Sequence, residues 1–449
     1  MTQDELFRHV GVQPGKALRP RLALVACAAL GVALLPWVEN CRAETQEVVC
    51  DDGNGMYETQ MHNGVTVRVG PPVSGGFSAR ACSASLILEG AVVTAVAPTA
   101  QVDIDVLGAD LGFGVPVVAF QVRRADDTWR ASYVIYSLDK NPRLLATITG
   151  GDLYRASDAD FDKRVAIWTT DAAAVNGFDD LTYADLDAPT IVLRYEHGRL
   201  MDVSAEYQAQ YDRQIAQMRA QLDAQALSDF RKSDGRLALG SVPGADLVRL
   251  RKTKAKVLGI VWAYLYSGRD QQAWAELSEL WPAADADRAK AAILSCRAKG
   301  IEAQVAGVAG KPSPGLWKKH PYIYETEKAS GSGETNEASN LPDLGRGVMP
   351  TSSESSESDA PTQSTADTPP RYFLMRAPPG SPVANPAART TERMTLTIDE
   401  TGKVWSAKME APEQDPTLVA AAMGWKFVPA FKGGHPVACI YRMTVSPEL

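Results

Sequence analysis

Alternating carboxylates are the residues whose spacing most directly suggests chemistry in this sequence. Asp158, Asp160 and Asp162 lie in one short stretch. Ca²⁺ takes several oxygen ligands within about 2.5 Å, so such carboxylates could converge on one ion. However, Lys163 stands where a Ca²⁺-binding loop requires Gly, and Thr169 stands where a bidentate Glu would complete the ligand shell. We therefore expect a solvated acidic turn here, with a Ca²⁺ site as the alternative.

Few other patterns could support catalysis. The 449-residue chain contains only 5 His and 6 Cys, and these are scattered. It lacks the His-Glu-x-x-His, Cys-x-x-Cys and Gly-x-Ser-x-Gly motifs. Gly310-Lys311 is followed by Pro312 and does not form a phosphate-binding loop motif. The sequence thus predicts no catalytic residue, no metal site and no cofactor, in a protein that is not an enzyme.

The charge balance argues against a nucleic-acid partner. Lys and Arg number 46 and Asp and Glu number 54, which gives a net charge of −8, whereas nucleic-acid binders normally carry a basic excess. The one basic patch in the sequence is the run Arg249, Arg251, Lys252, Lys254 and Lys256. We expect this cluster to be the solvated face of a helix. The alternative is attraction to an acidic partner, such as the protein's own linker.

The N-terminal residues 1–43 are expected to be an export signal or a membrane anchor. Basic residues precede an uncharged run from Leu22 to Val38, and the small Ala43 follows at a suitable cleavage position. The run is short for a bilayer span, although an uncleaved anchor stays open. A lipoprotein signal ending at Cys27 is a further alternative. Because the basic flank stays inside, we expect the later residues to lie in the periplasm or cell envelope.

Export determines how the cysteines are interpreted. In an oxidising compartment Cys50 and Cys82 can pair across a short Gly-rich segment, which would contribute roughly 3 kcal/mol by loop-closure entropy. The alternative is two separate buried thiols. Cys296 and Cys439 fall in different predicted domains, and we expect both to remain single.

The body of the chain changes its periodicity near residue 200. Residues 44–200 carry short β-branched runs separated by Gly, Pro, Asn and Asp, which predict a β-rich domain. The clearest runs are Val65–Val69, Ser85–Leu88, Val117–Val122, Tyr133–Tyr136, Val165–Trp168 and Ile191–Arg194. Residues 201–310 show helical spacing, with helices expected from Ser204, through Leu250–Leu265, from Trp274 to Pro282 and over Asp285–Lys299. This region is predicted to be an α-helical hairpin region.

Residues 311–370 are expected to form a disordered linker. From Pro350 to Pro370 the chain is almost wholly Ser, Thr, Pro, Asp and Glu, with no apolar residue larger than Ala. No burial could then offset the entropy of ordering this stretch. We expect the folded units on its two sides to move independently.

Residues 371–449 are predicted to form a small α+β domain. Met394, Leu396 and Ile398 alternate with polar residues, a turn follows, and Val404 begins a second strand. Asp415 and Pro416 suit the start of a helix that would continue to Phe427. A final strand is expected near Ala438–Val445. The expected fold class is therefore a multidomain α+β protein with a β-rich N-terminal part, a helical region, a linker and this C-terminal domain.

The C-terminal segment resembles the C-terminal domain of the TonB family. The family pattern of Asp-x-x-Gly-x-Val, an Ala-rich helix, Trp-x-Phe-x-Pro-Ala and Gly-x-Pro-Val is matched in order by residues 399–404, 420–422, 425–430 and 434–437. The resemblance covers only the last part of the chain. It implies that the domain captures an extended peptide of an outer-membrane transporter by strand addition, and, if the N-terminus is an anchor, that an inner-membrane motor complex is a partner.

The final strand is the candidate binding edge. Strand addition uses backbone hydrogen bonds and needs no catalytic side chain. The edge residues are Cys439, Ile440, Tyr441, Arg442, Met443 and Thr444. Trp425, Phe427 and Pro429 are expected to be core and turn residues.

Two functions follow from the resemblance. The first is a TonB-like envelope protein that couples energy to transport across the outer membrane. The alternative is an exported binding or scaffold protein that uses a TonB-like module without energy transduction. This alternative is favoured because Leu22–Val38 has no polar or His residue that could contact a motor complex, as a TonB-type anchor does.

Overall fold

The computed structural model describes the part of the chain that carries the predicted domains. The described ranges are 48–72, 80–158, 163–181, 185–186, 188–240, 243–308, 324–325, 369–374, 392–409, 416–433 and 435–445. The expected signal or anchor, residues 1–43, lies outside them, as does nearly all of the stretch from Pro350 to Pro370. Within the described ranges, no helix has the length and apolar character needed to cross a membrane.

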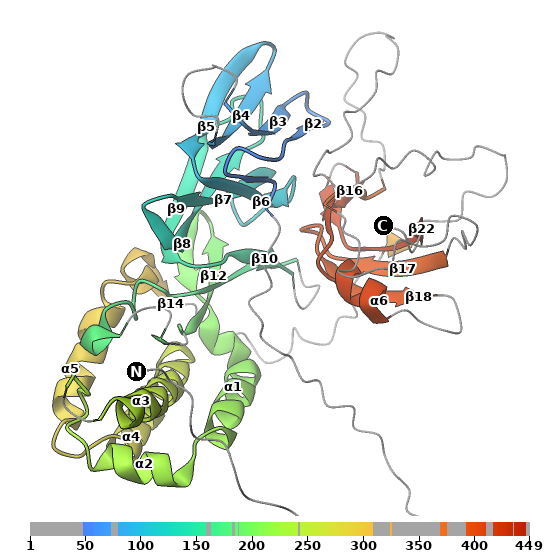
Figure 1. The fold of residues 1–449 in the computed structure, drawn as a ribbon. Coiled ribbons are helices and arrows are strands. Elements are labelled where there is room, and N and C mark those ends of the chain that lie inside the picture. The colour runs from blue at the N-terminus through green and yellow to red at the C-terminus, as the bar shows by residue number, and fades with distance from the viewer. Residues whose placement is uncertain are drawn as a thin grey trace, which may run out of the picture. The chain divides into compact units, whose positions relative to one another are not determined.

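Antiparallel strands build two sheets from the first part of the chain (Figure 1). One has the order β2-β3-β4-β5 and the other β1-β6-β7-β8-β9. Their bounds are β1 Cys50–Asp51, β2 Tyr57–Gln60, β3 Thr66–Gly70, β4 Cys82–Leu88, β5 Ala91–Thr99, β6 Gln101–Leu107, β7 Val117–Arg124, β8 Asp127–Ser137 and β9 Leu144–Gly151. The four β-branched runs expected here are confirmed as β3, β4, β7 and β8, whereas β5, β6 and β9 were not expected.

A disulfide joins Cys50 of β1 to Cys82 of β4 and so links the two sheets. The pairing expected for an oxidising compartment is therefore present. Cys296 and Cys439 are free thiols, as expected.

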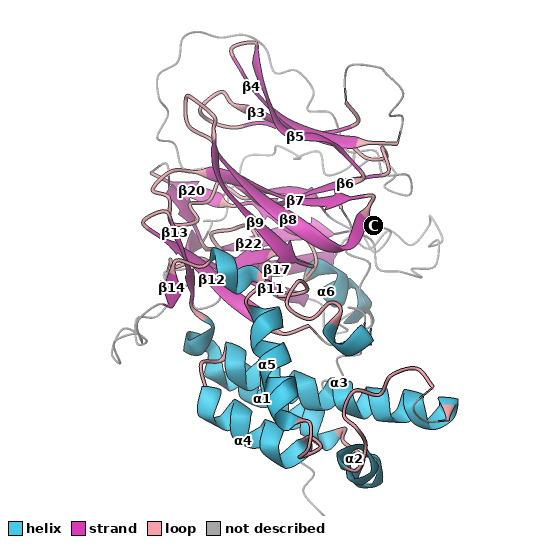
Figure 2. Cartoon of the chain, turned by 90° about the vertical axis from the view of Figure 1, so that its left-hand side faces the viewer, coloured by secondary structure: helices cyan, strands magenta, loops and turns pink. Residues whose placement is uncertain are grey.

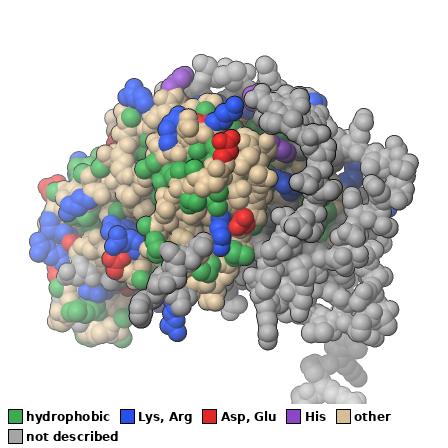
Figure 3. Space-filling model, turned by 90° about the horizontal axis from the view of Figure 1, so that it is seen from above, with side chains coloured by type: hydrophobic (Ala, Val, Ile, Leu, Met, Phe, Trp, Pro, Cys, Tyr) green, Lys and Arg blue, Asp and Glu red, His purple; other side chains and the backbone are tan. Residues whose placement is uncertain are grey.

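Figure 3 looks at the molecule from above and shows hydrophobic side chains gathered in the middle of that face, with charged side chains of both signs around them.

A third sheet and a group of helices complete the body. The sheet has the order β10-β11-β12-β13-β14, and its strands are β10 Arg155–Ser157, β11 Ala166–Thr170, β12 Thr190–Glu196, β13 Arg199–Asp202 and β14 Gly307–Val308. The helices are η1 Phe178–Asp180, η3 Ser204–Tyr207, α1 Gln208–Ala220, α2 Ala224–Arg231, α3 Gly244–Tyr266, α4 Asp270–Leu280, α5 Ala286–Arg297 and η4 Ile301–Gln304. Figure 2 shows α1 to α5 grouped together.

Helices occur where helical spacing predicted them, and one further helix is present. Gly268 ends the first long helix with a left-handed φ of 74°, which favours Gly. The short helix α2 was not expected, although Asp223 caps it by accepting a hydrogen bond from the Ala226 N–H at 2.7 Å.

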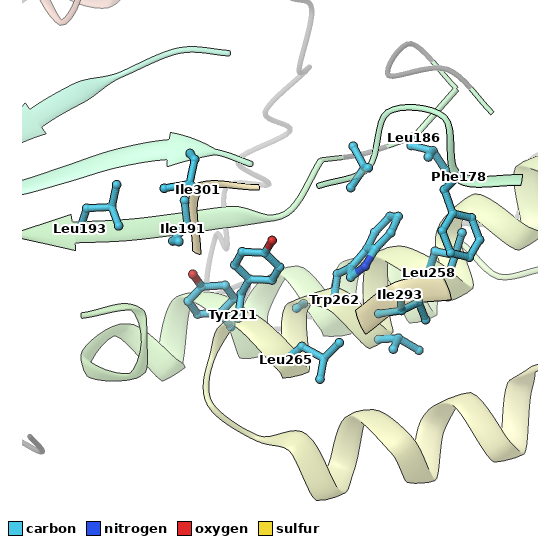
Figure 4. Packing of buried hydrophobic residues seen from close by; sticks show 14 of the residues in the cluster. Phe178, Leu186, Ile191, Leu193, Tyr211, Leu258, Trp262, Leu265, Ile293 and Ile301 are labelled. Atoms are coloured by element: carbon cyan, nitrogen blue, oxygen red, sulfur yellow. The ribbon is translucent and has the colours of Figure 1, made fainter. Parts of the chain in front are cut away.

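One hydrophobic core joins the β-rich part to the helices. Buried side chains from β8 through β12 to α5 belong to a single cluster. Figure 4 shows Trp262 and Leu258 of α3 beside Phe178 and Ile293, while Ile191 of β12 lies near Tyr211 of α1. The division near residue 200 is therefore a change in secondary structure within one packed body.

The basic run lies on α3 and is not uniformly solvated, contrary to expectation. The Lys254 side chain is fully buried. Its Nζ donates to Asp179 Oδ2 at 2.9 Å and to the Arg236 carbonyl at 2.9 Å, and it lies 5.6 Å from the centre of the Trp281 ring. Burial lowers the pKa of Lys254, although the Asp179 carboxylate opposes that shift. This lysine is therefore an internal tie between α3 and the η1 turn.

The C-terminal part contains two small sheets and one larger sheet. The larger sheet has the order β15-β22-β17-β18. The bounds are β15 Tyr324–Glu325, β16 Arg371–Leu374, β17 Glu392–Ile398, β18 Val404–Met409, α6 Pro416–Ala422, β19 Lys426–Val428, β20 Ala430–Lys432, β21 His435–Val437 and β22 Cys439–Val445. The expected strands β17, β18 and β22 and the helix α6 occur in the expected order, but β16, β19, β20 and β21 are additional. The helix ends at Ala422, and residues 426–428 instead pair with β16.

Asp171 ties the third sheet to the helices. Its Oδ2 accepts hydrogen bonds from the Tyr266 hydroxyl and the Ile301 N–H, both at 2.9 Å, and its Oδ1 accepts one from the Ala174 N–H at 3.2 Å. Gly300 approaches so closely that a Cβ there would meet Asp171 Oδ2 at 2.3 Å. Burial raises the pKa of Asp171 to about 6, although these hydrogen bonds oppose the shift.

We expect Asp171 to make stability fall as pH rises through about 6. Between pH 3.8 and about 6, Asp171 holds a proton in the folded state that it has already released in the unfolded chain, where its pKa is 3.8. The contribution is fully present below pH 3.8, and about 3 kcal/mol of unfolding free energy is lost as the pH passes the folded-state value. Urea unfolding of the wild type and Asp171→Asn at pH 4.5 and 7.5 measures it.

The control for this experiment is Asp52→Asn, at an exposed carboxylate. It should leave the difference in stability between the two pH values as it is in the wild type, whereas Asp171→Asn should reduce that difference. If the Asp171→Asn profile ran parallel to that of the wild type, Asp171 would not be the group responsible.

Candidate functional site

The predicted binding edge is strand β22, which lies inside the larger C-terminal sheet. It pairs with β17 in seven antiparallel positions, from Glu392↔Val445 to Ile398↔Cys439. On its other side, Tyr324 and Glu325 pair with Cys439 and Ile440 in parallel orientation. The chain thus adds a strand of its own to the first part of the predicted edge, within the segment that was expected to be a disordered linker.

The side chains of the edge differ in exposure. Cys439 is fully buried, and burial raises the pKa of its thiol to about 12, so it is no nucleophile near neutral pH. Arg442 is exposed, Ile440, Tyr441 and Met443 are half-buried, and the side chain of Thr444 is outside the described set. What β22 offers along its length is therefore its backbone.

The residues expected to be core are confirmed as such. Trp425 and Phe427 are buried, and Pro429 is buried as well. The Phe427 ring meets the Tyr441 ring of β22 at a centroid distance of 6.0 Å. The cluster also contains Leu418 and Ala422 of α6, so the helix covers one face of the sheet.

The turn at residues 399–404 is organised by one buried carboxylate. Asp399 Oδ1 accepts hydrogen bonds from the N–H groups of Thr401 and Lys403 at 2.9 Å and from the Thr401 hydroxyl at 2.7 Å. Gly402 has a φ of 83°, and a Cβ there would lie 1.7 Å from the Phe427 carbonyl oxygen. Asp and Gly are thus required here by hydrogen bonding and by space, respectively.

The same turn contacts the body of the protein. The N–H of Asp158 donates to Asp399 Oδ2 at 3.2 Å, and the Thr401 hydroxyl oxygen lies 3.3 Å from the Ala156 carbonyl oxygen. Asp158 is buried, so the expectation of a solvated acidic turn is wrong for this residue. Its carboxylate accepts a hydrogen bond from the Lys163 N–H, while Asp160 and Asp162 lie outside the described ranges.

Two buried ion pairs join the C-terminal part to β6. Lys403 Nζ lies 2.6 Å from Asp105 Oδ1, and Lys426 Nζ lies 2.6 Å from Asp103 Oδ2. All four side chains are at least nine-tenths buried, with exposed fractions of 6% and 1% in the first pair and 8% and 2% in the second. Lys403 also donates to the Asp105 carbonyl, and Lys426 donates to the Ile104 carbonyl at 3.1 Å.

Further hydrogen bonds hold the two aspartates in place. Asp105 Oδ2 accepts from the Tyr133 hydroxyl at 2.6 Å and from the Ala156 N–H at 2.8 Å, and Asp103 Oδ1 accepts from the Val49 N–H at 3.3 Å. Burial by itself would raise the pKa of Asp105, but the Lys403 and Lys426 ammonium groups outweigh it and lower that pKa. Burial also lowers the pKa of Lys403, against the attraction of Asp105.

Apolar contacts accompany the ion pairs. Val428 and Phe431 belong to the hydrophobic cluster that contains Val118 and Phe120 of β7. The Phe431 ring also meets the His62 ring edge-on at 5.6 Å. The expectation that the units on either side of the linker move independently is therefore wrong for the C-terminal part, because it shares both a core and buried charges with the body.

The aspartates of β6 were not predicted as important residues. The signal was present in Val102-Asp103-Ile104-Asp105-Val106, where two acids alternate with β-branched residues. Acids in such a run need a counter-charge if the strand is buried on both faces. The local sequence does not indicate which residue supplies that counter-charge, because Lys403 lies 298 positions from Asp105.

The arrangement offers no set of ligands for a metal ion among the residues that the structure describes. Comparison with known proteins adds nothing to the geometry, since no family model, no curated protein and no solved structure matches the chain. The features of the C-terminal part that bear on function are the edge of β22 and the attachment of its sheet to the body.

We expect Lys403→Met to lower the free energy of unfolding by about 3–5 kcal/mol, because it leaves the Asp105 carboxylate buried without its counter-charge. Urea unfolding of the full chain measures the loss. Lys408→Met is the matched control, since Lys408 lies on β18, the strand that begins directly after Lys403, and is exposed, so its loss should stay within about 0.5 kcal/mol.

A second variant separates charge from packing. Adding Asp105→Asn to Lys403→Met removes the uncompensated charge, so part of the lost stability should return. Equal losses for Lys403→Met and Lys408→Met would contradict the role given to the buried pair.

Proposed function

We propose that this protein is a TonB-like envelope protein that binds an extended peptide of an outer-membrane transporter by strand addition, in energy-coupled transport across the outer membrane. The observation that carries the proposal is the backbone of β22. Among the described strands, β17 is the one that pairs with Arg442–Val445, and β15 covers only Cys439 and Ile440 on the opposite side. A sheet edge of this kind provides hydrogen bonds for an added strand.

Export to the periplasm or cell envelope is part of the proposal. It rests on the basic and apolar pattern of residues 1–43. The Cys50–Cys82 disulfide supports it, since disulfides persist in oxidising compartments. If the N-terminal segment stays in the inner membrane, a motor complex there is the second partner.

The attachment of the C-terminal part to the body favours a second candidate function. A protein whose peptide-binding sheet is held by the Asp103–Lys426 and Asp105–Lys403 pairs presents the bound peptide beside the first β-sheets. Such a protein would act as a binding or scaffold protein of the envelope without energy transduction.

The intact mass of the protein from its native host separates these two functions. Direct transduction requires a continuous chain from the membrane to β22, so a mass that includes residues 1–43 is expected for a transducer. A mass that begins near residue 44 would overturn energy coupling and leave the binding function.

We expect proline at one of two neighbouring positions of β22 to abolish peptide binding with the fold intact. Successive N–H groups of a strand point alternately to its two sides, so one of Arg442 and Met443 directs its N–H to β17 and the other to the open side. Proline removes the N–H and is tolerated only on the open side. Calorimetry with synthetic peptides from the host's outer-membrane transporters measures binding, and urea unfolding identifies the tolerated variant.

Alanine variants at the same positions are the controls. Arg442→Ala and Met443→Ala keep the backbone N–H groups, so both should bind peptide with less than about a tenfold change in affinity. If the tolerated proline variant bound as tightly as its alanine counterpart, or if no transporter peptide bound the wild type, strand addition at β22 would be excluded.

A further inference from the structure

The open side of β22 is already used by another segment of the same chain. Tyr324 pairs with Cys439 and Glu325 pairs with Ile440, in parallel orientation. In the order β15-β22-β17-β18, the strand β15 is the outermost member of the sheet. The pairs β17·β18 and β17·β22 are antiparallel, so within this sheet β15 differs from the other described strands in its orientation.

The sequence around β15 differs from its surroundings in a way that suits a strand. Tyr322, Ile323, Tyr324 and Thr326 are all β-formers in succession around Glu325. The residues after it, from Ala329 to Asn340, are mostly Gly, Ser, Glu and Asn, which are poor strand formers or neutral ones. The run of β-formers from Tyr322 to Thr326 is therefore the local signal for a strand within the predicted linker.

We propose that Tyr324–Glu325 is a resident strand that competes with the partner peptide for the edge of β22. This inference rests on the proposed function, since it assigns regulation to the same edge. A partner peptide that pairs with Cys439 and Ile440 must displace β15, whereas one confined to Arg442–Val445 need not.

The resident strand is suited to displacement rather than to permanent closure. It pairs at two positions, whereas β17 pairs with β22 at seven. The net contribution of one hydrogen bond changes an equilibrium constant by about tenfold or less. A pairing at only two positions is therefore weak by itself. Its covalent link to the sheet makes the pairing intramolecular, which raises the local concentration of the strand above that of a free peptide at low concentration. Together these favour a closed edge that a longer peptide can open.

Hydrogen exchange of the full chain tests the resident strand without any partner. The variant Tyr324→Pro/Glu325→Pro removes both N–H groups, and Tyr324→Ala/Glu325→Ala keeps them. In the proline variant, amide exchange in the segment Cys439–Tyr441 should become about tenfold faster, and the alanine variant should exchange more slowly than the proline variant. Equal exchange in the wild type and the proline variant would overturn the inference.

A peptide supplied in trans gives a second readout. A synthetic peptide of residues 319–328 should bind the proline variant at least about tenfold more tightly than it binds the wild type, whose edge is occupied. Equal affinity would again count against a resident strand.

The results distinguish this inference from the proposed function. If transporter peptides bind the wild type and the proline variant equally, and exchange is unchanged, the resident strand is wrong and strand addition stands. If exchange and the 319–328 peptide respond as expected but no transporter peptide binds either form, the resident strand stands and the transport function fails.

Discussion

Two lysines from the C-terminal part reach two aspartates inside the first part of the chain, and the rest of the structure depends on this pairing. Asp103 and Asp105 lie on β6, where their carboxylates are removed from water. An ionised carboxylate in such a place is strongly unfavourable without a partner, and so is a buried ammonium group. Lys403 and Lys426 satisfy both requirements at once. The body and the C-terminal part are therefore each incomplete without the other.

This constraint also explains the residues on which the TonB-like pattern depends. Asp399 organises the turn that directs Lys403 toward β6, and Gly402 allows that turn to approach the Phe427 carbonyl. Phe427 and Trp425 form the core beneath the sheet. The conspicuous side chains thus serve packing and attachment. The strand β22 lies beside β17, which leads directly into the Asp399 turn.

Local patterns predicted the elements well where a single face or stripe is buried. The β-branched runs at β3, β7 and β12 and the helical spacing of α1 and α3 are examples. Prediction failed where distant parts of the chain decide the outcome. The helix was expected to continue to Phe427, yet Lys426–Val428 is a strand that pairs with β16. Lys254 has a side chain typical of a surface, yet it is buried because its partner Asp179 lies in another element. Asp158 is buried where its backbone N–H meets Asp399 of the distant C-terminal turn.

The site itself was only partly accessible to sequence reasoning. The alternation in Cys439–Val445 located the strand, but its second neighbour comes from a stretch between long polar segments. The buried acids of β6 were visible as an unusual alternation, but the identity of their partners is a property of the fold. Such pairings over hundreds of residues have no local signature.

The cluster formed by Val428 and Phe431 with β7 has a consequence for the order of events during synthesis. The first sheets emerge early, yet part of their interior is supplied by strands close to the C-terminus. Folding that depends on contacts so far apart in sequence is intrinsically slow. Under the export that we propose, β6 would cross the membrane well before Lys403 and Lys426. The first sheets could then complete their core only after the last strands had crossed, and Asp103 and Asp105 would stay in water until that point.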